Sequence, residues 1–178
     1  EIQVRAPNRR PRFFESYVEG ILERDLAGLG DVADRAVVAR LLGAIGAISG
    51  AELNIDRLSN SLEIPATTIR RHIELLEMPF LIRRVPAWST TLLARAVNSP
   101  KIRGAATGLL AYLVGADERR SEADLDLGVM FYEMFVATEL QRQISWLDDR
   151  PALFHFRDRD QREVDIIIEH RDGSISAV

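Results

Sequence analysis

An α+β fold is predicted by three features of the sequence. Apolar residues recur at helical spacing through the first half of the chain, two short helical segments are separated by a tight turn near Pro65, and residues 152–178 alternate apolar strands with turns. We therefore expect a linker at 1–12, a helical domain with a helix-turn-helix and a wing at 13–116, and a smaller α/β domain at 117–178.

Two amphipathic helices are expected at the start of the helical domain. Apolar side chains recur at helical spacing from Phe13 to Leu26, which predicts the first helix. The second should follow Asp34, whose carboxylate suits an N-cap, and should end at Gly50. Each of these helices has one apolar face, which it is expected to bury.

A helix-turn-helix is predicted at residues 53–77. A short helix is broken at residues 63–65, and a new helix begins at Thr67. Extended segments at 80–88 and 98–104 are consistent with the strands of a wing, which would complete a winged-helix arrangement. Because a recognition helix and a wing are the parts that meet DNA, the residues expected to contact DNA are Thr67, Thr68, Arg70, Arg71, Arg83, Arg84, Lys101 and Arg103, with His72 also turned to solvent.

The rest of the chain is expected to hold two helices followed by a β-meander. A short apolar helix is predicted at 106–115, a polar loop at 117–126 and a long helix at 127–146. The strands are then predicted at 152–158, 163–170 and 174–178.

Charge is distributed unevenly, although the net charge is only −4. Residues 56–103 carry eight basic and four acidic side chains, whereas residues 117–149 carry nine acidic and three basic ones. The net charge alone argues against nucleic-acid binding, but the basic region contains the predicted recognition helix and wing. Lys101 is the only lysine in the chain, so the high arginine content partly reflects the overall composition of the chain and not a chemical requirement at each position.

Several classes of site are excluded by missing residues. The chain has no cysteine, which excludes disulfides and thiolate zinc sites, and its three histidines are scattered. It contains no P-loop, no G-x-S-x-G and no H-E-x-x-H motif. Its apolar runs are too short for a membrane span, and without a secretory signal a cytoplasmic protein is expected. Because the first residue is Glu1, we expect a fragment of a longer protein.

Two carboxylates are the candidate metal ligands and catalytic residues. Glu133 interrupts an apolar helical stripe, where an unpaired carboxylate would be costly to bury. Asp165 stands in an apolar strand, on the same face as Glu163. A helix glutamate and a strand aspartate suit a hard cation such as Mg²⁺. The alternative for Glu133 is a structural salt bridge to an arginine such as Arg157 or Arg162.

The order of several segments resembles the C-terminal region of bacterial and archaeal AAA-type ATPases that carry an appended domain of unknown function. The segments are "RFFESYVEGILERDL", "LNIDRLSNSLEIPATTIRRHIELLE", "MPFLIRRVPAW", "SPKI", "FYEMFVATEL" and "FRDRDQREVDIIIEHRDGSISAV". In that family a P-loop ATPase domain precedes a winged helix, and the final domain is similar to PD-(D/E)XK, or restriction-endonuclease-like, nucleases. The resemblance implies that residues 1–12 are a linker after an ATP-binding ATPase domain or a remnant of that domain, and that 117–178 is a nuclease-like domain, truncated at its C-terminus.

The resemblance also implies roles for the two carboxylates. Glu133 matches the helix glutamate and Asp165 the strand aspartate of a Mg²⁺ site, which a Glu-x-Lys on the following strand normally completes. This sequence contains no such Glu-x-Lys after Asp165. We therefore expect neither nucleolysis nor, without a P-loop, ATP hydrolysis from this chain by itself.

Three functions remain open at this point. The first is a DNA-binding or accessory region of a longer ATPase, whose partners would be DNA and its own ATPase domain. The second is a metal-dependent nuclease domain built on Glu133 and Asp165, inactive here for lack of the Glu-x-Lys strand. The third is a structural or protein-docking module, which would be indifferent to both DNA and metal.

Overall fold

The computed structural model describes residues 9–24, 35–158 and 160–178. Within these ranges the chain forms eight helices and two antiparallel sheets, so the fold is α+β as the sequence predicts. Leu26 and Asp34, the predicted end of the first helix and the predicted cap of the second, lie outside the described residues. No described helix is long and apolar enough to cross a membrane.

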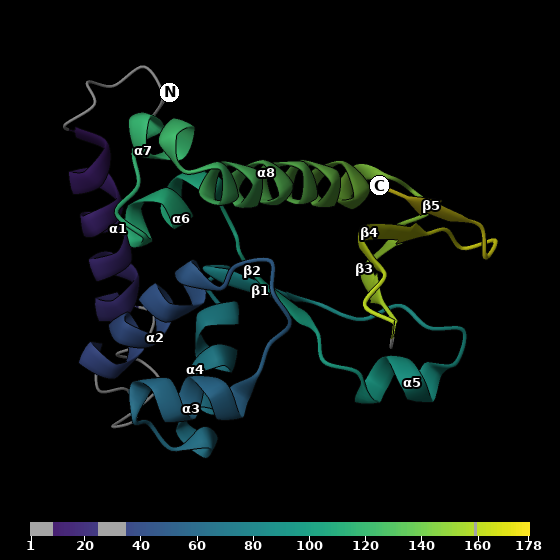
Figure 1. The fold of residues 1–178 in the computed structure, drawn as a ribbon, viewed down its shortest axis with the longest axis horizontal. Helices are drawn as coiled ribbons and strands as arrows, with labels where there is room; N and C mark the ends of the chain where they lie inside the picture. Colours follow the sequence, from purple (N-terminus) through teal and green to yellow (C-terminus); the bar gives the residue numbers. More distant parts are fainter. Residues whose placement is uncertain (1–8, 25–34, 159) are drawn as a thin grey trace.

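Four helices in the first half pack around one apolar core (Figure 1). The first begins four residues before the predicted Phe13, with Pro11 in its first turn, where a missing amide hydrogen costs nothing. Leu41, Ile69 and Leu76 are fully buried in this core. The four helices are α1 (Arg9–Arg24), α2 (Arg35–Ala47), α3 (Ile55–Leu62) and α4 (Ala66–Glu77).

A two-stranded antiparallel sheet follows α4. It consists of β1 (Ile82–Val85) and β2 (Lys101–Gly104), and these strands lie within the two extended segments that the sequence predicts. The register places Ile82 opposite Gly104 and Val85 opposite Lys101. This sheet therefore carries four of the predicted DNA contacts on its two short strands.

The connection between β1 and β2 contains a helix that the sequence analysis did not predict. This helix, α5, spans Leu92–Val97, and the Oγ1 atom of Thr91 caps it by accepting a hydrogen bond from the Ala94 amide at 3.3 Å. The same connection reaches the C-terminal half, because His155 donates its amide hydrogen to the Pro86 carbonyl at 3.0 Å. A helix this short shows too little periodicity to be recognised in the sequence.

Three further helices lead to the C-terminal sheet. The prediction of a polar loop at 117–126 is wrong, because most of that segment is helical. Asp117 caps the new helix by accepting a hydrogen bond from the Arg120 amide at 2.9 Å, so an acidic residue that suggested a loop is an N-cap. The longest helix spans the molecule from α6 and α7 to the sheet (Figure 1). The helices are α6 (Thr107–Leu113), α7 (Glu118–Ala123) and α8 (Leu125–Trp146).

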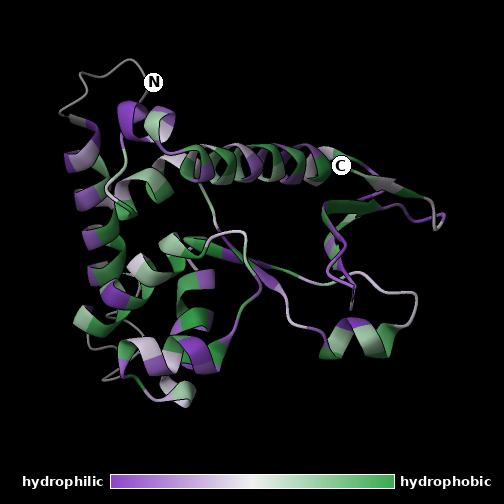
Figure 2. Ribbon diagram, viewed as in Figure 1, coloured by the Kyte–Doolittle hydropathy of each residue, from purple (hydrophilic) through white to green (hydrophobic). Residues whose placement is uncertain are grey.

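A three-stranded antiparallel sheet in the order β3-β4-β5 ends the chain. A second core, which includes Ala137, Ile144, Leu153 and Ile166, joins this sheet to α8. Figure 2 shows hydrophobic residues along α8 and β4, and both elements contribute residues to this core. The register places Leu153 opposite Ile168 and Ile167 opposite Ala177. The strands are β3 (Ala152–Arg157), β4 (Glu163–Glu169) and β5 (Ile175–Ala177).

Candidate functional site

The turn between α3 and α4 is held by local hydrogen bonds. Asn54 caps α3, since its Oδ1 atom accepts a hydrogen bond from the Arg57 amide at 2.8 Å. Glu63 ends α3 in the left-handed conformation, with a φ of 55°. The Ser59 hydroxyl then donates to the Ile64 carbonyl at 2.7 Å. These contacts set the position of α4 relative to α3 and therefore the direction in which its polar face points.

The N-terminal half of α4 carries polar side chains on its outer face. Thr67, Arg70 and Arg71 are exposed, and Thr68 is half-buried. His72 differs, because only 1% of its surface is exposed. The prediction that His72 turns to solvent is wrong, since the buried stripe of α4 is wide enough to include it.

The two arginines of β1 are both exposed but differ in their partners. Arg84 donates from Nε to Glu77 Oε1 at 2.9 Å and from Nη2 to Glu77 Oε2 at 2.5 Å. This hydrogen-bonded pair raises the pKa of Arg84. The Arg83 guanidinium instead lies 5.2 Å from the centre of the Phe80 ring. The charge of Arg84 is thus compensated by a carboxylate, whereas Arg83 is held by an aromatic face.

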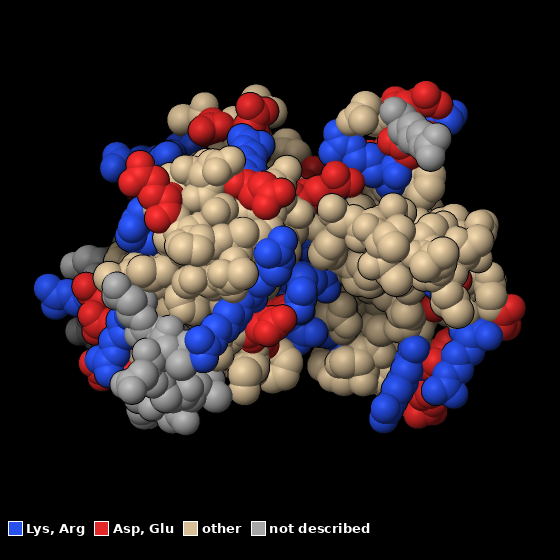
Figure 3. All heavy atoms as spheres, turned by 90° about the horizontal axis from the view of Figure 1, so that it is seen from below, with Lys and Arg blue, Asp and Glu red and all other residues tan. Residues whose placement is uncertain are grey.

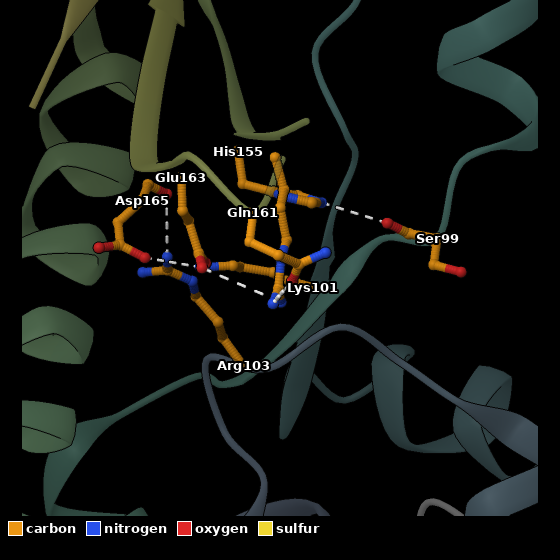
Figure 4. A network of polar contacts seen from close by, with 8 residues as sticks. Ser99, Lys101, Arg103, His155, Gln161, Glu163 and Asp165 are labelled. Carbon is orange, nitrogen blue, oxygen red and sulfur yellow. Dashed lines mark hydrogen bonds and ion pairs between the residues drawn. The ribbon is translucent and has the colours of Figure 1, made fainter. Parts of the chain in front are cut away.

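Lys101 and Arg103 do not lie on an outer surface of β2, as the DNA-contact prediction requires. Only 3% of Lys101 and 5% of Arg103 is exposed. The Lys101 Nζ atom lies 2.6 Å from Asp165 Oδ1 and also pairs with Glu163, while Arg103 Nη2 donates to the Asp165 carbonyl at 3.1 Å (Figure 4). The prediction is therefore wrong for these two residues, because β4 covers them and supplies their partners.

Glu133 on α8 belongs to the same cluster of charges. Burial raises the pKa of the Glu133 carboxyl, and the nearby Asp165 carboxylate raises it further. Lys101 and Arg103 act in the opposite direction and lower this pKa. Charged groups shift one another's pKa only at short range, so α8, β2 and β4 bring their charged residues into one region.

The arginines predicted as salt-bridge partners of Glu133 have other partners. Arg157 donates a hydrogen bond to Gln161, and Arg162 donates from Nε to Asp158 Oδ2 at 2.7 Å. The positive charges that act on Glu133 come instead from the buried cations of β2. The salt bridge of Glu133 to Arg157 or Arg162 is therefore not found among the described residues, and the structural alternative for Glu133 stays a prediction.

The carboxylates of this cluster do not fit a metal ion. In the part of the chain that the structure describes, no group of three or more histidine, aspartate or glutamate side chains could hold one. The Lys101 ammonium lies against Glu163 and Asp165 and so occupies carboxylate oxygens that Mg²⁺ would need. Glu133 and Asp165 as metal ligands therefore disagree with this arrangement.

Sequence reasoning missed the contacts that join the two halves of the chain. Arg95, just before the end of α5, donates to both carboxylate oxygens of Glu169 at 2.5 and 2.7 Å. Its guanidinium also lies over the rings of Trp88 and Phe154, at 5.7 and 4.9 Å. One signal in the sequence points to the contact of Lys101 with Glu163 and Asp165. Lys101 is the only lysine in a chain rich in arginine.

Comparison with known families assigns most of the chain. Residues 2–120, more than half of its length, match the family described as Domain of unknown function (DUF8612). The chain belongs to the DUF8612 family. Residues 130–178 match a second family, Domain of unknown function (DUF4143). The DUF8612 match thus includes α3, α4, β1 and β2, and the DUF4143 match includes most of α8 and the three-stranded sheet.

Two curated relatives of this DUF8612 chain come from mycobacteria. They are uncharacterized protein Mb2031c of Mycobacterium bovis and uncharacterized protein Rv2008c of Mycobacterium tuberculosis. Each is 31% identical over 156 residues, which cover 87% of this chain and 34% of the relative. The DUF8612 chain therefore spans about a third of the length of the curated relatives it matches. No solved structure matches it.

Proposed function

We propose that this chain is the DNA-binding region of a longer protein that also carries an AAA-type ATPase domain. In this proposal α3 and α4 act as a helix-turn-helix, α4 is the recognition helix, and β1 and β2 form the wing. The observation that carries it is the exposed set of Thr67, Arg70 and Arg71 on the N-terminal half of α4. Hydroxyl and guanidinium groups in that position suit contacts with phosphates and base edges.

The proposed contact surface is smaller than the sequence alone suggests. Arg83 is exposed and belongs to it, whereas Lys101 and Arg103 are buried and Arg84 is paired with Glu77. Figure 3, which looks at the molecule from the side of α3, α4 and α5, shows basic side chains gathered in a central hollow with acidic ones beside them. A small basic surface within an acidic protein predicts weak binding that is sensitive to salt.

The proposed ATPase parent is supported by the family comparisons and by the order of sequence segments. The DUF4143 domain matched by residues 130–178 is found in AAA-ATPase-associated proteins. The matched relatives are also long enough to contain further domains, since this chain covers only 34% of each. In the proposed protein, DNA bound by α4 would be presented to the ATPase domain.

The test is fluorescence anisotropy of a labelled DNA duplex, titrated with the chain at several salt concentrations. We expect Arg70→Ala/Arg71→Ala to weaken binding and to reduce the slope of log affinity against log salt by about 2, close to 0.9 for each phosphate that the variant no longer neutralises. Arg119→Ala, which removes an exposed arginine of α7 far from α4 in sequence, is the matched control. Equal binding by the double variant and wild type would contradict the proposal.

A second candidate function is docking onto the rest of the longer protein, and one observation favours it. Helix α8 exposes a row of large apolar side chains, with 80% of Leu125, 70% of Tyr132 and 54% of Phe135 accessible. An apolar helix face of this kind is typical of a protein interface. Replacing Tyr132 and Phe135 by serine should then weaken association with the ATPase domain, measured with separately produced domains, without changing DNA binding.

A further inference from the structure

A small cavity between the β1–β2 sheet and α8 has a basic lining. Three arginines line it, Arg83 from β1, Arg103 from β2 and Arg142 from α8, and no acidic side chain of the described residues does. Thr138 and Gln141 add polar groups from the same helix. The cavity lies beside the carboxylate cluster around Lys101 but shares only Arg103 with it.

The hydrogen bonding of Arg103 is incomplete within the protein. Its Nη2 atom donates to the Asp165 carbonyl, but its Nε and Nη1 atoms are buried and have no hydrogen-bond partner among the described residues. A guanidinium with unmet donors is costly to bury, because each donor gives up water without gaining an acceptor. An acceptor that enters the cavity from outside would remove part of this cost.

The other two arginines differ in whether a carboxylate offsets their charge. Arg142 pairs with Glu139 on the same helix, at the exposed surface. Arg83 lies over the Phe80 ring, an interaction that keeps its cationic character. Among these side chains, Arg83 therefore contributes charge that no carboxylate contact of its own offsets in the described structure.

The size of the cavity limits what can enter. Its volume is about 80 Å³, and one water needs about 10–15 Å³ on the same measure. The space therefore holds a few waters or one tetrahedral oxyanion, but not a nucleotide base and sugar. Guanidinium groups match phosphate oxygens because their donors form a planar fork.

From this lining and this size we propose that the cavity binds a phosphate group, with Arg83 and Arg103 as its principal donors and Thr138 and Gln141 as polar neighbours. The phosphate is either free or part of a DNA backbone, and both sources offer the same oxygens. The site goes beyond the recognition helix, since none of Thr67, Arg70 and Arg71 lines it.

The experiment is isothermal titration of the whole chain with inorganic phosphate, in a buffer free of other oxyanions. We expect saturable binding that Arg83→Ala weakens about tenfold or more, since the variant removes a charge-assisted hydrogen bond. Arg119→Ala should bind like wild type. In a ¹H–¹⁵N spectrum, phosphate should shift the amide signals of Gly104 and Thr138, while those of α7 stay in place.

Two results would overturn the site: no saturable phosphate binding by wild type, or equal affinity in wild type and Arg83→Ala. Because Arg103→Ala risks unfolding the chain, Thr138→Val serves as a second variant, and it should weaken binding less than Arg83→Ala. Competition between phosphate and duplex DNA shows whether the cavity binds free phosphate or a phosphate of the DNA backbone. If phosphate displaces DNA, the site holds a backbone phosphate, and if phosphate binds while DNA does not, the site stands and the DNA-binding proposal fails.

Discussion

Lys101 on β2 and Asp165 on β4 form an ion pair of 2.6 Å across 64 residues of sequence. The lysine side chain is almost completely buried, whereas 38% of the Asp165 side chain is exposed. Glu163 supplies a second carboxylate to the same ammonium. This contact joins the N-terminal half of the chain to the C-terminal sheet, and its energetics depend on both carboxylates compensating the ammonium.

Replacing Lys101 by methionine should destabilise the chain by about 2–3 kcal/mol, because Glu163 and Asp165 then repel each other without a cation between them. The measurement is urea unfolding. In the Lys101→Met background, Asp165→Asn should lower the free energy of unfolding by less than it does in wild type. A double-mutant cycle measures this difference. Strictly additive effects would mean that the pair contributes no coupling energy.

Glu133→Gln should change how stability depends on pH. Burial raises the pKa of the Glu133 carboxyl, so the folded state binds a proton more readily than the unfolded state does. The contribution of Glu133 to stability therefore falls as pH rises from the ordinary carboxyl pKa through the raised one, and this contribution to the decline should be absent in the variant. Urea unfolding at a series of pH values measures it, with Glu122→Gln on α7 as an exposed control. An unchanged decline in Glu133→Gln would contradict the burial of this carboxyl.

Substitutions of the two arginines of β1 should affect different properties, DNA binding for Arg83 and stability for Arg84. Arg83→Ala is expected to reduce the salt dependence of DNA binding by the equivalent of about one phosphate and to leave folding almost unchanged. Arg84→Ala removes the partner of Glu77 and should instead lower stability, by about 0.5–1 kcal/mol for a partly exposed pair. Anisotropy and urea unfolding on the same two variants distinguish the cases, and a reversed pattern would show that the Glu77 contact does not hold Arg84.

Two helical glycines offer a matched pair of stability predictions. Gly128→Ala places a Cβ atom 2.9 Å from the Ser121 carbonyl oxygen, so backbone must move, and a destabilisation of about 1–3 kcal/mol is expected. Gly43→Ala on α2 meets nothing within 4 Å and should gain up to about 1 kcal/mol from helix propensity. Thermal unfolding compares both variants with wild type. A gain at both positions would show that α7 and α8 are not packed as closely as this contact requires.

Many of the helices and strands were predictable from the sequence, because their signals are local. Gly115, with a φ of 62°, ends the α6 region as expected, and α8 follows the apolar stripe that begins near Leu127. Helices α5 and α7 were missed for the opposite reason. Each is only six residues long, and both depend on caps, Thr91 and Asp117, whose residue types are equally common in loops.

The sequence by itself determined the α+β class, the turn between α3 and α4, and the common face of Glu163 and Asp165, since periodicity and capping act over a few residues. Only the tertiary structure decided which cations are available to a ligand. Lys101 and Arg103 look like surface residues in a short basic strand, but β4 arrives from far along the chain and buries them. Burial of a charge depends on such distant partners, and no local pattern records them.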